Sequence, residues 1–249
     1  MSGGLSRTAK KYIASLSVKK YRDREKCFLV EGEKSVAEFI ASDFKVKAVY
    51  CTGECSVRFS GSEIISAAEM RQISNLKTAS PVLAVVEIPV REQCAVSRDE
   101  LVLVLDDVQD PGNLGTIIRL AEWFGIKRIV CSPRTADAYG PKTVQASMGS
   151  MARAEVTYTD LRAFFATLDS DIPVYGTFLE GENIYDAKLS SGGVVAIGNE
   201  GNGISPEIAE FVSRRLFIPP FGSRVAESLN VAVAAAIVCS EFRRSVSHS

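Results

Sequence analysis

The sequence predicts an α/β protein with two units, the second built on a parallel β-sheet covered by helices. Three observations support this fold class. The length of 249 residues is enough for one large domain or two small ones. Residues 91–99 lose hydrophobic periodicity, as a linker does. Beyond Leu101–Leu105, a fully apolar run of strand type, strand-like and helix-like segments alternate regularly.

The first half of the chain predicts a small α/β unit, because short apolar runs alternate with segments of helical periodicity. A weak helix is expected first, since Tyr12, Ile13 and Leu16 recur among lysines. The expected elements, in order, are a helix over 9–22, a strand at Phe28–Val30, a helix over 33–41, a strand at Val46–Cys51, a helix at Ala67–Ile73 and a strand at Val82–Val90.

The second half predicts a parallel sheet, since its apolar strands are separated by segments long enough to form crossover helices. After Leu101–Leu105, strands are expected near 128–132, 155–159, 173–179, 194–198 and 216–218. The last helix, expected over 227–244, is too apolar for a free surface helix. We expect it to pack on the sheet or on a second subunit.

The charge of the chain is unevenly distributed. The net charge is −1, yet residues 1–98 carry 16 Lys and Arg against 11 Asp and Glu. Most of the excess lies in the first 26 residues, which hold eight basic side chains. Such an arm on an acidic body suits contacts with a phosphate backbone, and it equally suits a solvated first helix. Charge alone does not separate these two interpretations.

Several classes of protein are disfavoured by composition. No apolar run approaches the roughly 20 residues that a membrane span needs, and no signal peptide is visible at the N-terminus. The six cysteines follow no zinc-like spacing, and Cys51 and Cys55, the only close pair, have no histidine nearby. We therefore expect reduced thiols, a cytoplasmic location and no metal site. Trp123 and His248, the only histidine, are interpreted as structural or incidental.

Three segments rich in Gly, Asn, Pro and single charges follow apolar strands, which predicts that these strand ends meet at a site. The first, Asp106–Arg119, contains a Pro111-Gly112 turn signal and then Asn113, a good N-cap. The helix that follows has a buried-type stripe, which Arg119 flanks by one residue. That arginine can extend to solvent or point into a site. The stripe consists of Leu114, Ile117, Ile118 and Ala121.

The second segment, Gly198–Ser205, has glycines at 198, 201 and 203, which is not the spacing of dinucleotide-binding folds. It predicts either a backbone that approaches a ligand closely or merely an ornate loop. The third segment, Ile218–Ala232, ends a strand with two prolines and then opens the last helix. In that segment Ser228 or Glu227 can simply act as a helix cap.

Together, the three segments resemble the signature motifs of the SpoU/TrmH family of RNA ribose methyltransferases, in the SPOUT superfamily. The order and spacing of the motifs fit, and the resemblance covers nearly the whole chain. The N-terminal half is similar to the family's ribosomal-protein-like substrate-binding domain. The matching residues are Asn113, Gly115 and Arg119; Gly198–Gly201 with Gly203–Ser205; Ile218-Pro219 with Glu227–Val231; and, near the N-terminus, Tyr21–Asp23 and Phe28–Glu33.

The resemblance implies a fold and a reaction that the pattern of residues alone does not give. It implies a trefoil knot in the C-terminal domain and a homodimer through the knot region and the last helix. The implied domains are an RNA-binding domain over 1–92 and a methyltransferase domain over 99–249. The implied reaction transfers a methyl group from S-adenosylmethionine to a ribose 2'-hydroxyl of RNA, without a metal.

The resemblance also implies which residues form the site. Those that it places at the reacting centre are Arg119, Asn113, Glu200, Ser228 and Asn230, and those that it places at the cofactor are Gly198, Ile218, Leu229 and Asn199. Because a guanidinium has a pKa above about 12, Arg119 is either a strongly perturbed base or a cation that holds RNA phosphate and the developing alkoxide. One departure from some relatives is a longer stretch between Gly222 and Ser228, which affects the loop near Leu229.

Three functions fit this sequence. A 2'-O-methyltransferase of 23S-type rRNA is favoured, because relatives that act on tRNA often carry different extensions. A tRNA methyltransferase is the second candidate. The third, from another class, is an assembly factor that binds RNA without turnover. A dehydrogenase is disfavoured by the glycine spacing.

Overall fold

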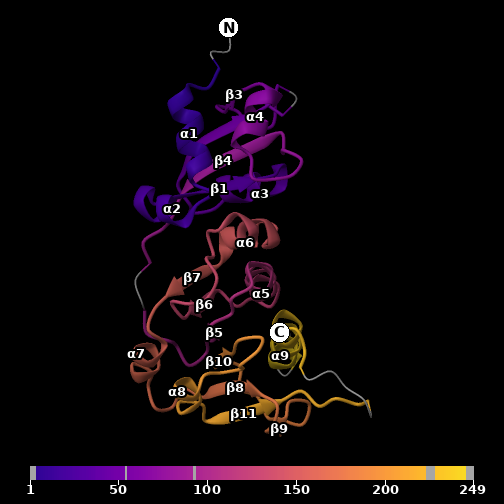
Figure 1. Cartoon of the computed structure of the whole chain (residues 1–249). Helices are drawn as coiled ribbons and strands as arrows, with labels where there is room; N and C mark the ends of the chain where they lie inside the picture. The colour runs from indigo at the N-terminus through magenta and orange to yellow at the C-terminus, as the bar shows by residue number, and fades with distance from the viewer. Residues whose placement is uncertain (1–3, 54, 92–93, 223–227, 245–249) are drawn as a thin grey trace. The chain divides into compact units, whose positions relative to one another are not determined.

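In the computed structural model, contacts group the chain into two compact units (Figure 1). The structure describes residues 4–53, 55–91, 94–222 and 228–244. Unit 1 consists of Met1–Val90 with Asp137–Ala152, and unit 2 consists of Arg91–Ala136 with Arg153–Ser249. The segment from 137 to 152 therefore packs with the first unit, although it lies in the second half of the sequence.

Unit 1 is built on a mixed four-stranded sheet in the order β1-β4-β2-β3. Strand β4 is antiparallel to both β1 and β2, and β2 pairs with β3 in parallel. Helices α1 and α4 pack together, and one core beneath them includes Ile13, Leu16, Met70 and Ile73. The strands are β1 (Cys27–Glu31), β2 (Val46–Cys51), β3 (Glu63–Ile64) and β4 (Val82–Glu87), and the helices are α1 (Arg7–Ser15), α2 (Lys19–Glu25), α3 (Glu33–Ile40) and α4 (Ala67–Ile73).

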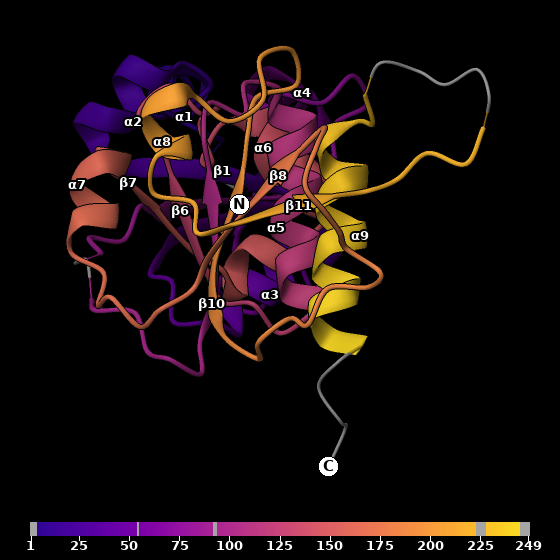
Figure 2. The same cartoon turned by 90° about the horizontal axis from the view of Figure 1, so that it is seen from below.

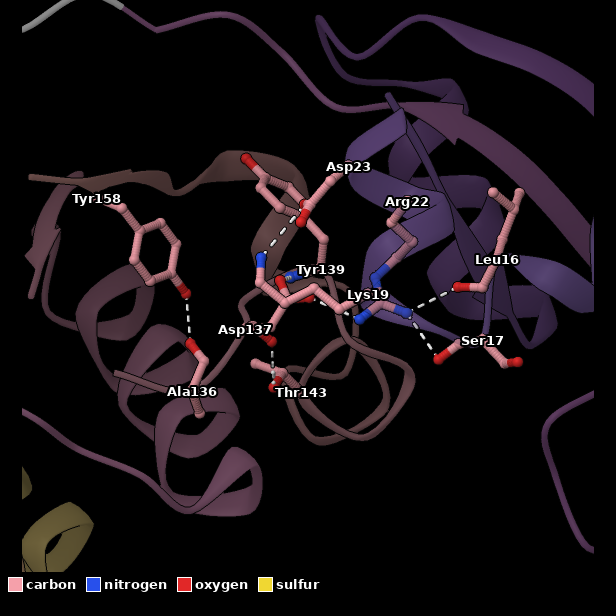
Figure 3. A network of polar contacts seen from close by, with 10 residues as sticks. All are labelled: Leu16, Ser17, Lys19, Arg22, Asp23, Ala136, Asp137, Tyr139, Thr143 and Tyr158. Atoms are coloured by element: carbon pink, nitrogen blue, oxygen red, sulfur yellow. Dashed lines mark hydrogen bonds and ion pairs between the residues drawn. The ribbon is translucent and has the colours of Figure 1, made fainter. Parts of the chain in front are cut away.

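The prediction of one helix over 9–22 is wrong, because the chain forms α1 and α2 with a break at Val18. Val18 is extended, with φ −102° and ψ 129°. The Arg22 guanidinium donates to the carbonyl oxygens of Leu16 and Ser17, at 2.8 and 2.7 Å (Figure 3). These carbonyls would otherwise accept bonds from a continuing helix. A buried cation thus takes over the acceptors at the end of α1.

Arg22 also anchors the 137–152 segment within unit 1 (Figure 3). Its Nη2 lies 2.6 Å from Oδ2 of Asp137, and the arginine side chain is only 5% exposed. The remaining Asp137 oxygen, Oδ1, accepts from the Tyr139 N–H at 3.0 Å. The Tyr139 ring lies 5.0 Å from that of Phe28, which places α6 (Pro141–Ala146) against β1.

Unit 2 contains a seven-stranded sheet, all of whose pairs are parallel, in the order β7-β6-β5-β10-β8-β11-β9. The predicted parallel sheet is thereby confirmed. All residues of β5 and β10 are buried, as expected for strands covered on both faces. The strands are β5 (Leu101–Leu105), β6 (Arg128–Cys131), β7 (Glu155–Tyr158), β8 (Val174–Phe178), β9 (Glu182–Asn183), β10 (Gly193–Ile197) and β11 (Arg214–Phe217).

Helices cover both faces of this sheet, with α7 (Leu161–Ala166) and α8 (Pro206–Ala209) on one side and α5 (Pro111–Trp123) and α9 (Val231–Arg244) on the other (Figure 2). Val102, Val104 and Phe165 share the core on the α7 side. On the other side, the Phe242 ring of α9 meets that of Tyr175 in β8 edge-on, at 4.9 Å. Within the described ranges, no helix is long and apolar enough to cross a membrane.

The last helix begins at Val231 rather than at 227, and it packs along α5 (Figure 2). Arg243, near its end, donates from Nε to the carbonyl of Phe124, just past the end of α5, at 2.7 Å. Asn230 meets Asn113 where both helices start. The two helices therefore run in the same direction, and a cation satisfies a carbonyl at the negative end of the α5 dipole.

Removing the carboxylate of Asp137 tests the buried ion pair. We expect Asp137→Ala to lower the free energy of unfolding by about 3 kcal/mol, because Arg22 is left as an unpaired buried charge. Asp23→Ala is the matched control, since Asp23 forms an exposed pair with Lys19 at 3.2 Å (Figure 3); it should cost under about 1 kcal/mol. Urea unfolding measures both, and equal losses would contradict a special role for Arg22.

A second prediction concerns the start of α4, where Ser66 and Glu69 form a reciprocal capping box. The backbone N–H of Ser66, with a further contribution from Lys10 at 3.1 Å, lowers the pKa of Glu69 from 4.5 to about 2. A lowered folded-state pKa stabilises the fold above the unfolded pKa, and this contribution is lost as the pH falls through the folded pKa.

We therefore expect Glu69→Gln to lower the melting temperature at pH 7, and the difference from the wild type to shrink between about pH 5 and pH 2. Glu63→Gln, at an exposed position of β3, serves as the control and should show a small effect at every pH. Thermal melts at pH 7, 5 and 3 check this. A Glu69→Gln difference that stays constant with pH would contradict it.

Candidate active site

The three polar segments meet at the carboxyl end of the parallel sheet in unit 2. Residues 106–113 follow β5, residues 198–205 follow β10, and residues 218–230 follow β11. Strands β5 and β10 are direct neighbours, and β8 separates β10 from β11. Carboxyl ends of parallel strands, where helices begin, commonly form ligand sites. Side-chain hydrogen bonds connect all three segments.

Helix α5 is capped by Asp110, not by Asn113 as the sequence suggested. The Asp110 carboxylate accepts from the Asn113 N–H at 2.7 Å, and Pro111 occupies the first helical position. The expectation of an Asn113 cap overlooked that the proline itself begins the helix. Because Asp110 serves as the cap, the side chain of Asn113 is available for other segments.

The Asn113 side chain joins the second and third segments. Its Nδ2 donates to Oε1 of Glu200 at 2.9 Å, and its Oδ1 accepts from Nδ2 of Asn230 at 3.0 Å. Asn230 in turn caps α9, since its Oδ1 accepts from the Ala232 and Val233 N–H groups at 2.9 and 3.3 Å. These three hydrogen-bonded side chains, Asn230–Asn113–Glu200, form what we call the amide chain.

The hydrogen bonds of the amide chain can run from donor to acceptor in only one direction. An ionised carboxylate can only accept, so the Asn113 NH₂ must face Glu200 and its oxygen must face Asn230. The Asn230 NH₂ is then the donor, which leaves the Asn230 oxygen for the α9 N-terminus, where N–H groups need acceptors. Each link thus fixes the next, and the start of α9 is tied to the loop after β10.

The loop after β10 closes tightly on itself at Gly198. A Cβ on Gly198 would lie 2.1 Å from both the Gly203 carbonyl carbon and the Ile204 nitrogen. Asn199 and Gly203 exchange two backbone hydrogen bonds of 2.9 Å. A side chain at 198 therefore cannot fit without moving the backbone. Closure of the loop is enough to explain why residue 198 is a glycine. The glycine therefore does not decide whether the backbone of this loop approaches a ligand or the loop is merely ornate.

Asn199 uses its side chain to hold this loop. Its Oδ1 accepts from the Gly201 and Asn202 N–H groups at 2.9 and 3.1 Å, and its Nδ2 donates to the Asp107 carbonyl at 2.8 Å. The side chain therefore positions Glu200, the next residue, relative to the end of β5.

Arg119 lies on the exposed face of α5, while the predicted stripe at Leu114, Ile117, Ile118 and Ala121 is buried. Among the described residues it has no hydrogen-bond or ion-pair partner, so its guanidinium is free to meet a ligand. Trp123, four residues further along the same face, is 84% exposed.

The other predicted residues of the third segment lie between β11 and Asn230. Ile218 is half-buried directly after β11, and Ser228 and Leu229 are exposed just before Asn230. The structure gives their side chains no hydrogen bond to the amide chain. Glu227 of the third motif lies outside the described residues.

Three exposed apolar side chains lie in the segments that follow strands of the sheet. Leu179 follows β8 and is 71% exposed, Phe221 follows β11 and is 91% exposed, and Leu229 is 48% exposed.

The sequence did not predict that the aspartates at the end of β5 hold the loop after β10 in place. Asp106 is 5% exposed and accepts from the Ser205 N–H at 2.7 Å, which ties the second segment to the first. The signal was present, since a carboxylate directly after a buried strand needs a donor nearby.

The described thiols near the sheet are structural. Burial raises the pKa of Cys131, at the end of β6, well above its usual value, and raises that of Cys239, in α9, to about 12. Neither is a thiolate at neutral pH, so neither is a nucleophile. The described residues contain no cluster of His, Cys, Asp and Glu able to hold a metal.

Comparison with known proteins agrees with this arrangement. The model of the SpoU rRNA Methylase family matches residues 100–240. The chain belongs to the SpoU rRNA Methylase family. The MRM3-like substrate binding domain matches residues 9–84. The chain is 34% identical over 235 residues to the 23S rRNA (guanosine(2553)-2'-O)-methyltransferase RlmP of Bacillus subtilis, which covers 92% of this chain and 93% of that protein.

Solved structures of related methyltransferases share the fold over nearly the whole chain. A TrmH-family protein from Porphyromonas gingivalis has a TM-score of 0.87 and 40% identity, covering 96% of this chain and 98% of that one. An AdoMet-bound rRNA methyltransferase from Sinorhizobium meliloti has a TM-score of 0.86 and 28% identity, covering 97% and 96%. The predicted fold class, an α/β SPOUT methyltransferase domain with a small N-terminal α/β domain, is confirmed.

Two glycines of the second segment give a matched test of the tight loop. We expect Gly198→Ala to lower the free energy of unfolding by about 3 kcal/mol, because the new methyl group meets backbone atoms that must shift. Gly201→Ala should change it by less than about 0.5 kcal/mol, because its Cβ would approach nothing closer than 3.5 Å. Chemical unfolding of both variants checks this, and a tolerated Gly198→Ala would contradict the geometry.

Proposed function

We propose that this protein is an S-adenosylmethionine-dependent 2'-O-methyltransferase of 23S-type rRNA. The observation that carries the proposal is the amide chain, which joins the three strand-end segments of a SpoU-family fold through side chains able to meet a ribose. Relatives that match nearly the whole chain supply the substrate class. One is the Bacillus subtilis enzyme, and another is the 23S rRNA (uridine(2479)-2'-O)-methyltransferase of Streptomyces viridochromogenes, 28% identical over 255 residues.

The residues at the strand ends fit S-adenosylmethionine. Gly198 allows the loop after β10 to close on itself, and the exposed side chains of Leu179, Phe221 and Leu229 would offer apolar contacts to an adenine ring. Backbone groups of Gly198, Ile218 and Leu229 would hold the cofactor. Asn199 would contribute by shaping the loop, because its side-chain atoms already have internal partners.

When bound, S-adenosylmethionine supplies a methyl group already activated on a positively charged sulfur. The remaining task of the protein is to make the ribose hydroxyl a nucleophile. Asn113, Ser228 and Asn230 would orient the ribose, and Glu200 would accept a hydrogen bond from it through Oε2, to which no described residue donates. Holding these groups in fixed geometry lowers the barrier without a metal.

Arg119 would act on the charge that develops on the ribose oxygen. Its guanidinium either serves as a strongly perturbed base or, as a cation, holds an RNA phosphate and stabilises the alkoxide. Its exposure and its lack of a described partner support contact with the substrate.

Two domains would share the work, namely residues 1–92 for RNA binding and residues 99–249 for methyl transfer. The match of 9–84 to a substrate binding domain supports the first assignment. Exposed basic side chains of the N-terminal arm, such as Lys11, Lys20 and Arg24, suit a phosphate backbone. The target would be a loop or distorted helix, where the 2'-hydroxyl is accessible.

The proposal includes a trefoil knot around the cofactor site, a homodimer formed by the knot region and α9, and a cytoplasmic location. Apolar exposure supports the dimer, since Trp123 on α5 is 84% exposed and Val233 on α9 is 48% exposed. Such surface is costly to leave in water.

A tRNA substrate is less well supported. A solved structure from work on the 2-OH methylation of C/U34 on tRNA covers only 60% of this chain, with a TM-score of 0.54 and 26% identity. The rRNA relatives also cover the N-terminal half.

Incubation with labelled S-adenosylmethionine and total RNA tests the proposal. Label in large-subunit rRNA is expected, and ribose methylation mapped in a deletion strain should lose one site. Label in tRNA alone would shift the substrate class. If no RNA is labelled, both methyltransferase functions are excluded and the non-catalytic assembly factor is the remaining candidate.

Conservative substitution tests Arg119. We expect Arg119→Lys to reduce kcat by about 100-fold or more, because an ammonium cannot reproduce the planar donor fork. Arg162→Lys is the matched control, since Arg162 is an exposed arginine on α7, and it should retain wild-type rates. Single-turnover methyl transfer measures both. Full activity of Arg119→Lys would exclude a special need for the guanidinium.

A further inference from the structure

A second arginine, Arg134, stands at the same edge of the sheet as the amide chain. It lies in the tight turn Ser132–Thr135 that follows β6, where the Thr135 N–H donates to the Ser132 carbonyl at 3.1 Å. The Thr135 hydroxyl donates to the carbonyl of Leu105, the last residue of β5, at 3.1 Å. Two neighbouring strand ends thus fix the backbone that carries Arg134.

Asp107 holds the guanidinium of Arg134 on this rim. Asp107 has a φ of +60°, a left-handed conformation that costs a non-glycine residue some energy. All its polar atoms are used. Its N–H donates to the Ser132 hydroxyl at 3.0 Å, which in turn donates to Oδ1 at 2.6 Å. Its carbonyl accepts from Asn199, and Oδ2 pairs with Nη2 of Arg134.

The pair is asymmetric in exposure. The Asp107 side chain is 14% exposed, whereas that of Arg134 is 76% exposed. A guanidinium has five N–H donors, and only Nη2 meets Asp107, so the others face solvent. The aspartate therefore restricts the arginine to one direction and leaves most of its donors for a second anion. This lowers the entropy lost when a ligand binds.

The loops around Arg134 are negatively charged, so a cation is needed there if RNA is to bind. Asp106, Asp107, Asp110 and Glu200 place four carboxylates at the ends of β5 and β10. An RNA backbone would be repelled there unless cations intervened. In the described parts of 106–119, 132–136 and 198–205, the basic side chains are Arg119 and Arg134.

We propose that Arg134, oriented by Asp107, binds a phosphate of the substrate RNA close to the ribose that is methylated. This inference rests on the proposed function, and it adds a substrate-positioning residue outside the three motifs. Asp107 is linked through Asn199 to the loop that carries Glu200, so the phosphate site and the reacting centre share one rigid frame.

The test compares Arg134→Ala and Arg134→Lys with Arg162→Ala, an exposed arginine on α7. The affinity for an in-vitro transcribed 23S rRNA is measured at salt concentrations from about 0.05 to about 0.3 M, a range of about sixfold. For Arg134→Ala, the slope of log affinity against log salt should fall by about 1. The KM for RNA should rise about fivefold, with the KM for S-adenosylmethionine unchanged. Arg134→Lys should keep most of the slope, and Arg162→Ala all of it.

An unchanged salt slope and RNA KM in Arg134→Ala would overturn the proposal. So would a rise in the KM for S-adenosylmethionine of the same size, since that would indicate a general disturbance of the site. A wild-type protein that methylates no RNA would refute the proposed function instead. In that case the salt titration would still decide the role of Arg134, because it measures binding alone.

Discussion

The side-chain amide of Asn113 is the interaction on which the rest of the site depends. Its two partners, Glu200 and Asn230, lie 87 and 117 residues further along the chain. A carboxylate at one end and a helix N-terminus at the other leave the amide only one orientation. The start of α9, the loop after β10 and the first turn of α5 are therefore held in one geometry by side chains that are themselves candidates for substrate contact.

This frame needs rigid supports behind it, and the aspartates at the end of β5 supply them. Asp106 holds the end of the second segment through Ser205, and Asp107 holds its beginning through Asn199. Gly198 allows the loop to close without a side chain. Polar residues outside the amide chain thus determine the position of Glu200. A few supporting hydrogen bonds of this kind can set the geometry of a site.

In unit 1, a buried arginine organises the fold in a comparable way. Arg22 ends α1, orients α2 and fixes the 137–152 segment through Asp137. That segment leaves unit 2 after β6 and returns to it before β7, so the two units are joined by three stretches of chain rather than by one linker. A linker at 91–99 was the only connection visible in the sequence pattern.

By itself, the sequence determined the elements whose signals are local. The apolar runs predicted the longer strands of both sheets but not the two-residue strands β3 and β9, and the stripe from Leu114 to Ala121 predicted the buried face of α5. The three motifs indicated the family, which the comparisons confirm, and named site residues that stay a prediction. Only the tertiary structure decided that Asp110 caps α5, that Arg22 divides the first helix, and that Asp107 orients Arg134. The reason is physical. Periodicity reports what each segment buries, whereas the partner of a single polar group is chosen by segments that are distant in sequence and meet only in the fold.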